Sequence, residues 1–157
     1  MLTRLENKIP PPLVMVISAA AMWLIAANTP VAFLATLSSS LYWGLIFLLF
    51  ISGLGIGLGG MLSFKHAQTT INPLKPESAS NLVSSGIFQY TRNPMYISLT
   101  LMLCSWGVYL QSAWAWILVP VFMLYITRCQ IIPEERAMQQ LFGEEFEQYK
   151  MRVRRWL

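Results

Sequence analysis

Two adjacent carboxylates, Glu134 and Glu135, follow directly after a long apolar stretch near the end of the chain. A polar segment of about 28 residues, from Lys65 to Arg92, follows an earlier apolar stretch. Segments of this length without regular structure are usually functional or disordered, and the aromatic and β-branched residues here argue against disorder. Carboxylates beside apolar surroundings are suited to holding a cationic ligand. The residues alone therefore predict a site made from this segment, the start of the next apolar stretch and the Glu134–Glu135 turn.

The single histidine and the two cysteines do not predict a metal site. His66 lies just beyond an apolar stretch, and because one histidine cannot hold a metal alone, we expect an interfacial polar residue. Cys104 and Cys129 lie in or beside apolar stretches. We expect them to be buried thiols without a disulfide framework.

Five glycines lie within the eight residues 53–60 of the second apolar stretch, and three of them, Gly55, Gly57 and Gly60, match the G-x-G-x-x-G dinucleotide pattern. That pattern needs a preceding β-strand, which the lipid-like surroundings do not provide. Small residues four apart, such as Gly53 with Gly57, instead allow a second helix to approach closely. We therefore interpret these glycines as a helix-packing surface.

The elements that must position these residues are membrane helices. Of the 157 residues, 55% are hydrophobic and only 11% are charged, whereas soluble domains carry about 25% charged residues. The chain is therefore predicted to be an all-α membrane protein with a single domain, residues 1–157. Four apolar segments approach the length that crosses a bilayer, and the last two should form a tight hairpin; they span about 13–27, 41–64, 94–109 and 113–132. The small residues Ala19–Ala21 lie inside the first segment, so a retained span is favoured over a cleaved signal.

The charged residues all fall on connections that four spans would place on one face of the membrane. They occupy the N-terminus, the segment 65–93 and the chain from Arg128 onward, while the connections around 28–40 and 110–112 carry none. The positive-inside rule predicts that this face, with both termini, is cytoplasmic. The net charge of +4 forms no dense basic stripe, so membrane lipids are expected as partners and nucleic acid is not.

The last segment, 133–153, is predicted to be a separate amphipathic helix on the cytoplasmic side. Pro133 followed by two acids is typical of a helix start. Apolar residues then recur every three or four positions, at Met138, Phe142, Phe146, Tyr149 and Val153. This periodicity predicts a helix that lies along the membrane surface or folds back over the bundle.

The runs SNLVSSGIFQYTRNPMY (80–96) and PEERAMQQLFGEEFEQYKMRVRRW (133–156) resemble the isoprenylcysteine carboxyl methyltransferase family, which is related to the phospholipid methyltransferases. The family pattern is roughly L-V-x-x-G-x-Y, R-H-P-x-Y, a hydrophobic hairpin, E-E and then F-G-x-x-Y-x-x-Y. The resemblance covers about half of the chain, with its parts in the same order.

The resemblance implies an integral membrane methyltransferase that uses S-adenosylmethionine at its cytoplasmic side. Carried over by position, it implies catalytic roles for Glu134, Tyr96 and Arg92. It also implies that the cofactor is bound by Pro73, Ser80, Asn81, Leu82, Val83, Phe88, Asn93, Pro94, Met95, Tyr96 and Glu134. The methyl acceptor would be a lipophilic small molecule or a lipid-linked group.

Two positions depart from the family pattern. Asn93 replaces the histidine of R-H-P-x-Y, and because an amide does not change charge near neutral pH, we expect it to position the cofactor and not to act as a base. Gln130 stands where prenylcysteine enzymes carry a substrate-side arginine, with Arg128 as the nearest alternative. Two other functions stay open: a membrane NADPH-dependent reductase of sterol-reductase-like architecture, and a non-catalytic accessory protein.

Overall fold

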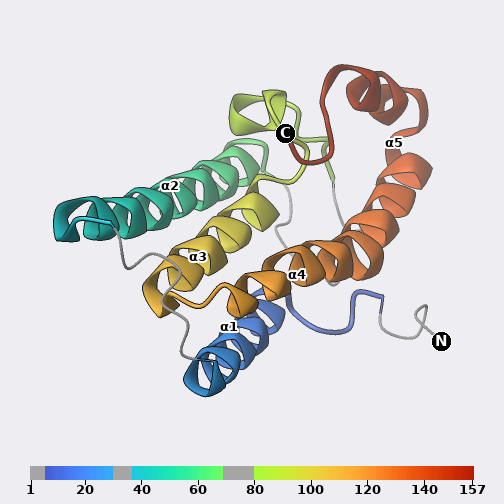
Figure 1. Cartoon of the computed structure of the whole chain (residues 1–157). Helices are drawn as coiled ribbons and strands as arrows, with labels where there is room; N and C mark the ends of the chain where they lie inside the picture. Colours follow the sequence, from blue (N-terminus) through green and yellow to red (C-terminus); the bar gives the residue numbers. More distant parts are fainter. Residues whose placement is uncertain (1–5, 30–36, 69–79) are drawn as a thin grey trace.

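The computed structural model describes residues 6–29, 37–68 and 80–157, and in these ranges the regular structure is entirely helical. Its elements are α1 (Pro11–Asn28), α2 (Ser39–His66), a 3₁₀ turn (Gly86–Gln89), α3 (Pro94–Leu110), a second 3₁₀ turn (Trp114–Ile117), α4 (Leu118–Ile126), a π-helical turn (Thr127–Ile131) and α5 (Ile132–Arg152). The predicted all-α class is confirmed. Figure 1 shows the helices as one bundle.

Three helices are long and apolar enough to cross a membrane: α1, α2 and the continuous helix from Trp114 to Arg152. The apolar part of the last helix ends near Ile132, and its charged residues other than Arg128 follow that point. The fourth predicted span corresponds to α3, which is apolar but has only 17 residues. The chain is therefore an integral membrane protein, and the count of four spans stays a prediction.

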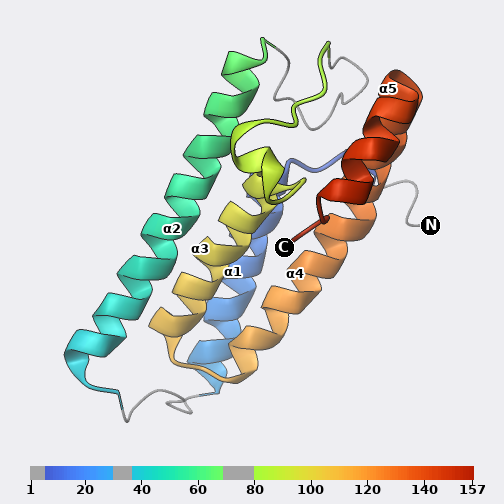
Figure 2. The same ribbon diagram turned by 90° about the horizontal axis from the view of Figure 1, so that it is seen from above.

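Helix α3 is the centre of the bundle, with α2 packed along one side and α1 on another (Figures 1 and 2). A Cβ atom at Gly53 would lie 3.0 Å from the carbonyl oxygen of Ser98, and one at Gly57 would lie 2.6 Å from the Ser98 hydroxyl. The predicted helix-packing surface is thus confirmed for Gly53 and Gly57, because only a residue without a side chain allows this approach. Gly55 has open space around it and takes no part in the contact.

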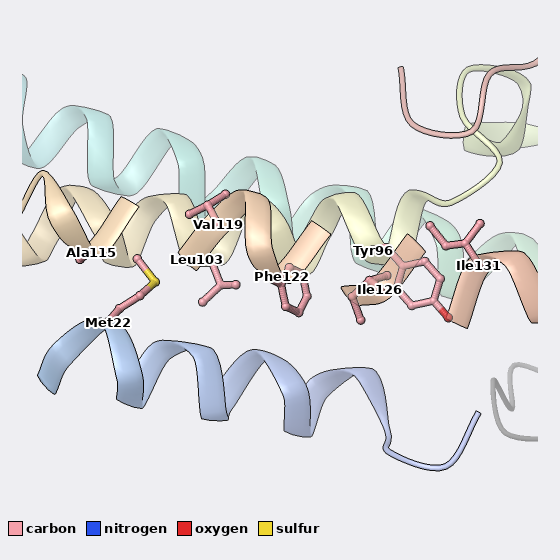
Figure 3. Packing of buried hydrophobic residues seen from close by; sticks show 8 residues of the cluster. All are labelled: Met22, Tyr96, Leu103, Ala115, Val119, Phe122, Ile126 and Ile131. Atoms are coloured by element: carbon pink, nitrogen blue, oxygen red, sulfur yellow. The ribbon is translucent and has the colours of Figure 1, made fainter. Parts of the chain in front are cut away.

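The main hydrophobic core lies where α1, α3 and the last helix meet (Figure 3). Met22 of α1 points towards Leu103 of α3 and Ala115 at one end, and Tyr96 and Ile131 occupy the other end. Phe122 and Ile126 lie between them and are fully buried. This core holds the start of α3 beside the start of α5.

The chain does not break at Pro133, so the predicted separate helix start there is wrong. A proline cannot donate a hydrogen bond to the carbonyl four residues before it, and its ring crowds that carbonyl. The π-helical turn accommodates this crowding, and the freed carbonyl oxygen of Cys129 accepts a hydrogen bond from the backbone N–H of Asn7 at 3.0 Å. Helix α4 therefore continues through the π turn into α5.

The fold-back predicted for the C-terminal segment occurs at Gly143 inside α5. Gly143 has φ 47° and ψ −118°, a conformation that residues with a side chain rarely adopt. The chain beyond it returns over residues 80–90, and Phe146, Tyr149 and Val153 form a second core with Val83 and Phe88. Figure 2 shows this segment at the end of the bundle opposite the hairpin at 111–113.

Candidate functional site

A cavity of about 580 Å³ lies at the same end of the bundle as the C-terminal fold-back, between α2, the segment 80–93, the start of α3 and α5. This volume is typical of small-molecule sites in proteins. Most of the residues singled out from the sequence share its wall: Asn81, Leu82, Val83, Phe88, Arg92, Asn93, Pro94, Met95, Tyr96 and Glu134. Two segments that are separated by about 40 residues in the sequence thus line one cavity.

Among the described residues, one expected cofactor contact, Ser80, is not on this wall. The Ser80 side chain is directed elsewhere and donates a hydrogen bond to the carbonyl oxygen of Gln68 at 3.3 Å. Pro73 lies outside the described residues. Asn81 does line the cavity, and its amide nitrogen also donates to the carbonyl oxygen of Ala67 at 2.8 Å, which ties the segment to the end of α2.

Glu134 and Tyr96 form a direct pair on the cavity wall. The phenolic O–H of Tyr96, in the first turn of α3, donates a hydrogen bond to Oε1 of Glu134, in the first turn of α5. Among the described residues, no arginine or lysine forms an ion pair with Glu134. Burial therefore raises the pKa of the Glu134 carboxyl to about 8, since no described side chain offers it a positive charge that would favour the ionised form.

Glu135 has very different neighbours. Its Oε1 accepts hydrogen bonds from Nη2 of Arg92 at 2.8 Å and from Nε of Arg155 at 3.1 Å, and its Oε2 accepts from Nη2 of Arg155 at 2.6 Å. Burial disfavours the charged form of Glu135, but these hydrogen bonds and positive charges outweigh it and hold the pKa of the carboxyl below its usual value. Glu135 is thus ionised and forms an ion cluster with Arg92 and Arg155.

Helix α3 begins at Pro94 because a proline at the first helical position loses no hydrogen bond there. The carbonyl oxygen of Asn93 accepts the N–H groups of Tyr96 and Ile97. The amide nitrogen of the Asn93 side chain donates to the carbonyl oxygen of Arg155 at 2.8 Å. Asn93 is therefore held by the C-terminal residues on one side of the cavity.

The remaining wall is apolar and aromatic. Phe88 packs edge-on against Phe64 with ring centres 5.3 Å apart, and its carbonyl oxygen accepts a hydrogen bond from the Tyr149 hydroxyl at 2.7 Å. Met61, Met95 and Met138 add thioether side chains to the wall. Such a lining suits a flat ring system and a soft cationic group.

Several wall residues were not found from the sequence. The cavity wall includes Pro10, Pro11 and Pro12, because the chain just before α1 packs against the π turn through the hydrogen bond from Asn7 to Cys129. Gly57, Ser98 and Leu99 line the cavity from the apolar helices. Their short or apolar side chains carry no chemical signal, so only the packing of α2 on α3 brings them to the site.

Gln130 takes no part in the wall, although the family pattern places a substrate-side residue there. Its side chain is fully buried and its amide nitrogen donates to the carbonyl oxygen of Ile9 at 2.9 Å. Arg128 is exposed and also lies off the cavity wall. Gln130 instead links the residues before α1 to the π turn.

Comparison with known proteins gives a family for this arrangement. Residues 43–145 match the phospholipid methyltransferase family. An uncharacterized protein of Haemophilus influenzae (strain ATCC 51907 / DSM 11121 / KW20 / Rd) is 44% identical over 63 residues, which is 40% of this chain and the whole of that protein. No solved structure matches the chain significantly. Since the family match covers well over half of the residues and includes most of the cavity wall, this chain belongs to the phospholipid methyltransferase family.

Proposed function

We propose that the chain is a membrane methyltransferase that takes its methyl group from S-adenosylmethionine and transfers it to a lipophilic or lipid-linked acceptor. The observation that carries this proposal is the buried carboxyl group of Glu134, which has no cationic partner among the described residues and stands on a largely apolar cavity wall. Family membership supports the reaction class, and the cavity chemistry supports this methyl donor.

The residues present fit S-adenosylmethionine in three respects. Burial raises the pKa of Glu134 to about 8, and a cationic ligand beside it would favour the ionised carboxylate and pair with it. Phe64, Phe88 and Phe146 offer aromatic faces, which attract cations and stack on flat rings. Asn81 supplies a polar side chain at the end of the wall formed by the segment 80–83.

S-adenosylmethionine, when bound, supplies a methyl group on a positively charged sulfur for direct displacement by a nucleophile. Because that charge disappears as the methyl group leaves, the protein gains most by orienting the reactants and excluding water. Glu134 would bind the cationic amino group or the ribose hydroxyls, and Tyr96 would fix the orientation of Glu134. Asn93, Pro94 and Met95 would form the floor beside them.

The acceptor side is expected at the part of the cavity nearest the bilayer. Gly57 of α2 and Ser98 and Leu99 of α3 line this part, and all three belong to apolar helices. A lipophilic acceptor would therefore reach the site from the membrane. The segments that carry the charged residues would bind the cofactor from the cytoplasm, with both termini on that side.

Cofactor binding is the decisive experiment. The protein, purified in detergent and reconstituted into nanodiscs, is titrated with S-adenosylmethionine by isothermal calorimetry, and saturable binding is expected. Glu134→Gln, which removes the charge and keeps the shape, should abolish or strongly weaken binding. Glu147→Gln is the matched control, because Glu147 is exposed and pairs only with Lys150 among the described residues, on the same helix.

The alternatives are outcomes of the same titration. Tight binding of NADPH without binding of S-adenosylmethionine would instead support the reductase. A folded protein that binds neither cofactor would support the accessory role. Either result, obtained with protein that is monodisperse and thermally stable, overturns the proposal.

A further inference from the structure

An ion cluster on the cavity wall joins three parts of the chain. Glu135 of α5 lies between Arg92, at the end of the segment 80–93, and Arg155, in the C-terminal residues. The side chains of Arg92 and Glu135 are only 11% and 17% exposed, so this is no surface ion pair. A charge in such a position holds its partners firmly, because removing one partner leaves the other charge buried and uncompensated.

Backbone contacts extend the cluster to the C-terminal residues. Nη1 of Arg92 donates to the carbonyl oxygens of Lys150 at 3.2 Å and Val153 at 2.9 Å, and its backbone N–H donates to Arg154 at 3.0 Å. The carbonyl oxygen of Arg155 accepts from Asn93 at 2.8 Å. The chain end is thus hydrogen-bonded along the residues that lead into α3.

The cluster also lies next to Tyr96 and Glu134, the two residues that form the hydrogen-bonded pair on the cavity wall. Glu135 is the neighbour of Glu134 in the first turn of α5, and Arg92 and Asn93 directly precede the turn of α3 that carries Tyr96. Fixing Glu135 between two guanidinium groups therefore fixes the approach of α5 to α3. The contact between Tyr96 and Glu134 depends on that approach.

We infer that Glu135 is a positioning residue, and that the C-terminal residues 153–156, which include Arg155, are a structural part of the ligand site. Resting on the proposed function, this inference assigns the two consecutive glutamates different roles. Glu134 contacts the cofactor, whereas Glu135 acts through Arg92, Arg155 and the backbone of its neighbour. Cofactor affinity should then depend on a carboxylate that lines the cavity but whose two oxygens are already bound by Arg92 and Arg155.

The first test needs no ligand. Hydrogen–deuterium exchange of the cofactor-free protein in nanodiscs is compared for wild type, Glu135→Gln and Glu147→Gln. Glu135→Gln should raise exchange in both 86–93 and 153–157, which are distant in sequence, while Glu147→Gln should not. Unchanged exchange in both segments in a folded Glu135→Gln protein overturns the inference.

The second test measures the dissociation constant of S-adenosylmethionine. Glu135→Gln and Arg155→Gln should each raise it roughly ten- to a hundredfold, as expected for a displaced binding geometry. The double variant should be little worse than either one, since both break the same contact. Arg155→Lys keeps the positive charge and should recover part of the affinity that Arg155→Gln loses. This pair of variants still tests the inference if the Glu135→Gln protein does not fold.

The outcomes separate the two proposals. A folded wild type that binds no S-adenosylmethionine overturns the proposed function. Wild type that binds, with Glu135→Gln and Arg155→Gln binding equally well, overturns only the positioning role. Additive losses in the double variant would also contradict it, because Glu135 and Arg155 would then act independently.

Discussion

Glu134 and Glu135 are consecutive residues whose surroundings give them opposite properties. Glu135 is enclosed by two guanidinium groups, whereas Glu134 receives a single hydrogen bond from the Tyr96 phenol among the described side chains. Pairs of carboxyl groups whose environments differ in this way commonly divide the tasks of a site between them. The Tyr96 hydroxyl is thus the side chain that decides where the Glu134 carboxylate points.

Tyr96→Phe tests this contact. The change removes only the hydroxyl group and leaves Glu134 without its donor, so the affinity for S-adenosylmethionine should fall. Loss of a donor to a buried acceptor also costs about 1–3 kcal/mol of stability. Calorimetric titration and thermal unfolding of the purified protein measure the two effects.

Tyr90→Phe is the matched control, because Tyr90 is 76% exposed. It should leave both the affinity and the unfolding temperature unchanged. If Tyr96→Phe behaves like Tyr90→Phe, the Tyr96–Glu134 contact has no role in binding.

Residue types and order predicted which segments meet, and the family resemblance predicted many of the side chains on the wall, but neither predicted the partners of Glu135. Its partners Arg92 and Arg155 lie 43 and 20 residues away in the sequence. No periodicity or motif links such positions, since the contacts depend on the fold-back of α5 and the path of the chain end. Ser80 shows the opposite case, because its place in the motif suggested a wall contact that its hydrogen bond to Gln68 replaces.

At the scale of helices, α5 is divided by Gly143 into a part that continues the membrane helix and a part that covers the segment 80–90. The apolar spacing from Met138 to Val153 predicted the covering face correctly. It could not predict where the helix bends, since a glycine within a polar stretch has no distinctive pattern.

Gly143→Ala should destabilise the fold-back. A Cβ at this position meets open space, so the cost comes from the backbone conformation, at about 1–3 kcal/mol. Phe146 and Tyr149 would lose their packing against Phe88 more often, and hydrogen exchange in 144–152 should rise.

Gly44→Ala serves as the comparison, because Gly44 is a helical glycine of α2 that also has open space around it. There the change should be neutral or slightly stabilising, since alanine favours a helix more than glycine does. Equal exchange in 144–152 for both variants would show that Gly143 is not needed for the bend.

The contact of α2 with α3 gives a second prediction for this scale. Gly57→Ala would place a Cβ atom 2.6 Å from the Ser98 hydroxyl, so the helices must separate at an expected cost of about 1–3 kcal/mol. The unfolding temperature should fall, and Ser98→Ala in the same protein should restore part of it. Gly55→Ala, where the helix faces open space, should have no such effect; an equal loss in both variants would contradict the close contact.

For the whole molecule, composition and charge distribution predicted the class of fold and the end of the bundle that carries the site. The first three apolar segments correspond to helices whose ends lie within a few residues of those expected, whereas the helix of the fourth runs on to Arg152. The junction at Pro133 was predicted wrongly, because a proline after an apolar run usually marks a helix start and the sequence contains no sign of the π turn or of Asn7 covering the Cys129 carbonyl. The tertiary contact of Asn7 with Cys129 therefore contributes to a continuous helix at Pro133, and the sequence gives no sign of that contact.

The orientation of the molecule in the membrane is the prediction that belongs to this scale. A protein whose own cysteines are replaced by Cys104→Ser and Cys129→Ala can carry single new cysteines at exposed positions on either end, by Ser38→Cys, Tyr90→Cys or Met151→Cys. Since basic residues favour the cytoplasmic side, a membrane-impermeant thiol reagent should label the Ser38→Cys protein in intact cells. It should label the Tyr90→Cys and Met151→Cys proteins only after permeabilisation. The reverse pattern would place the cavity on the outer side, where a cytoplasmic cofactor cannot reach it.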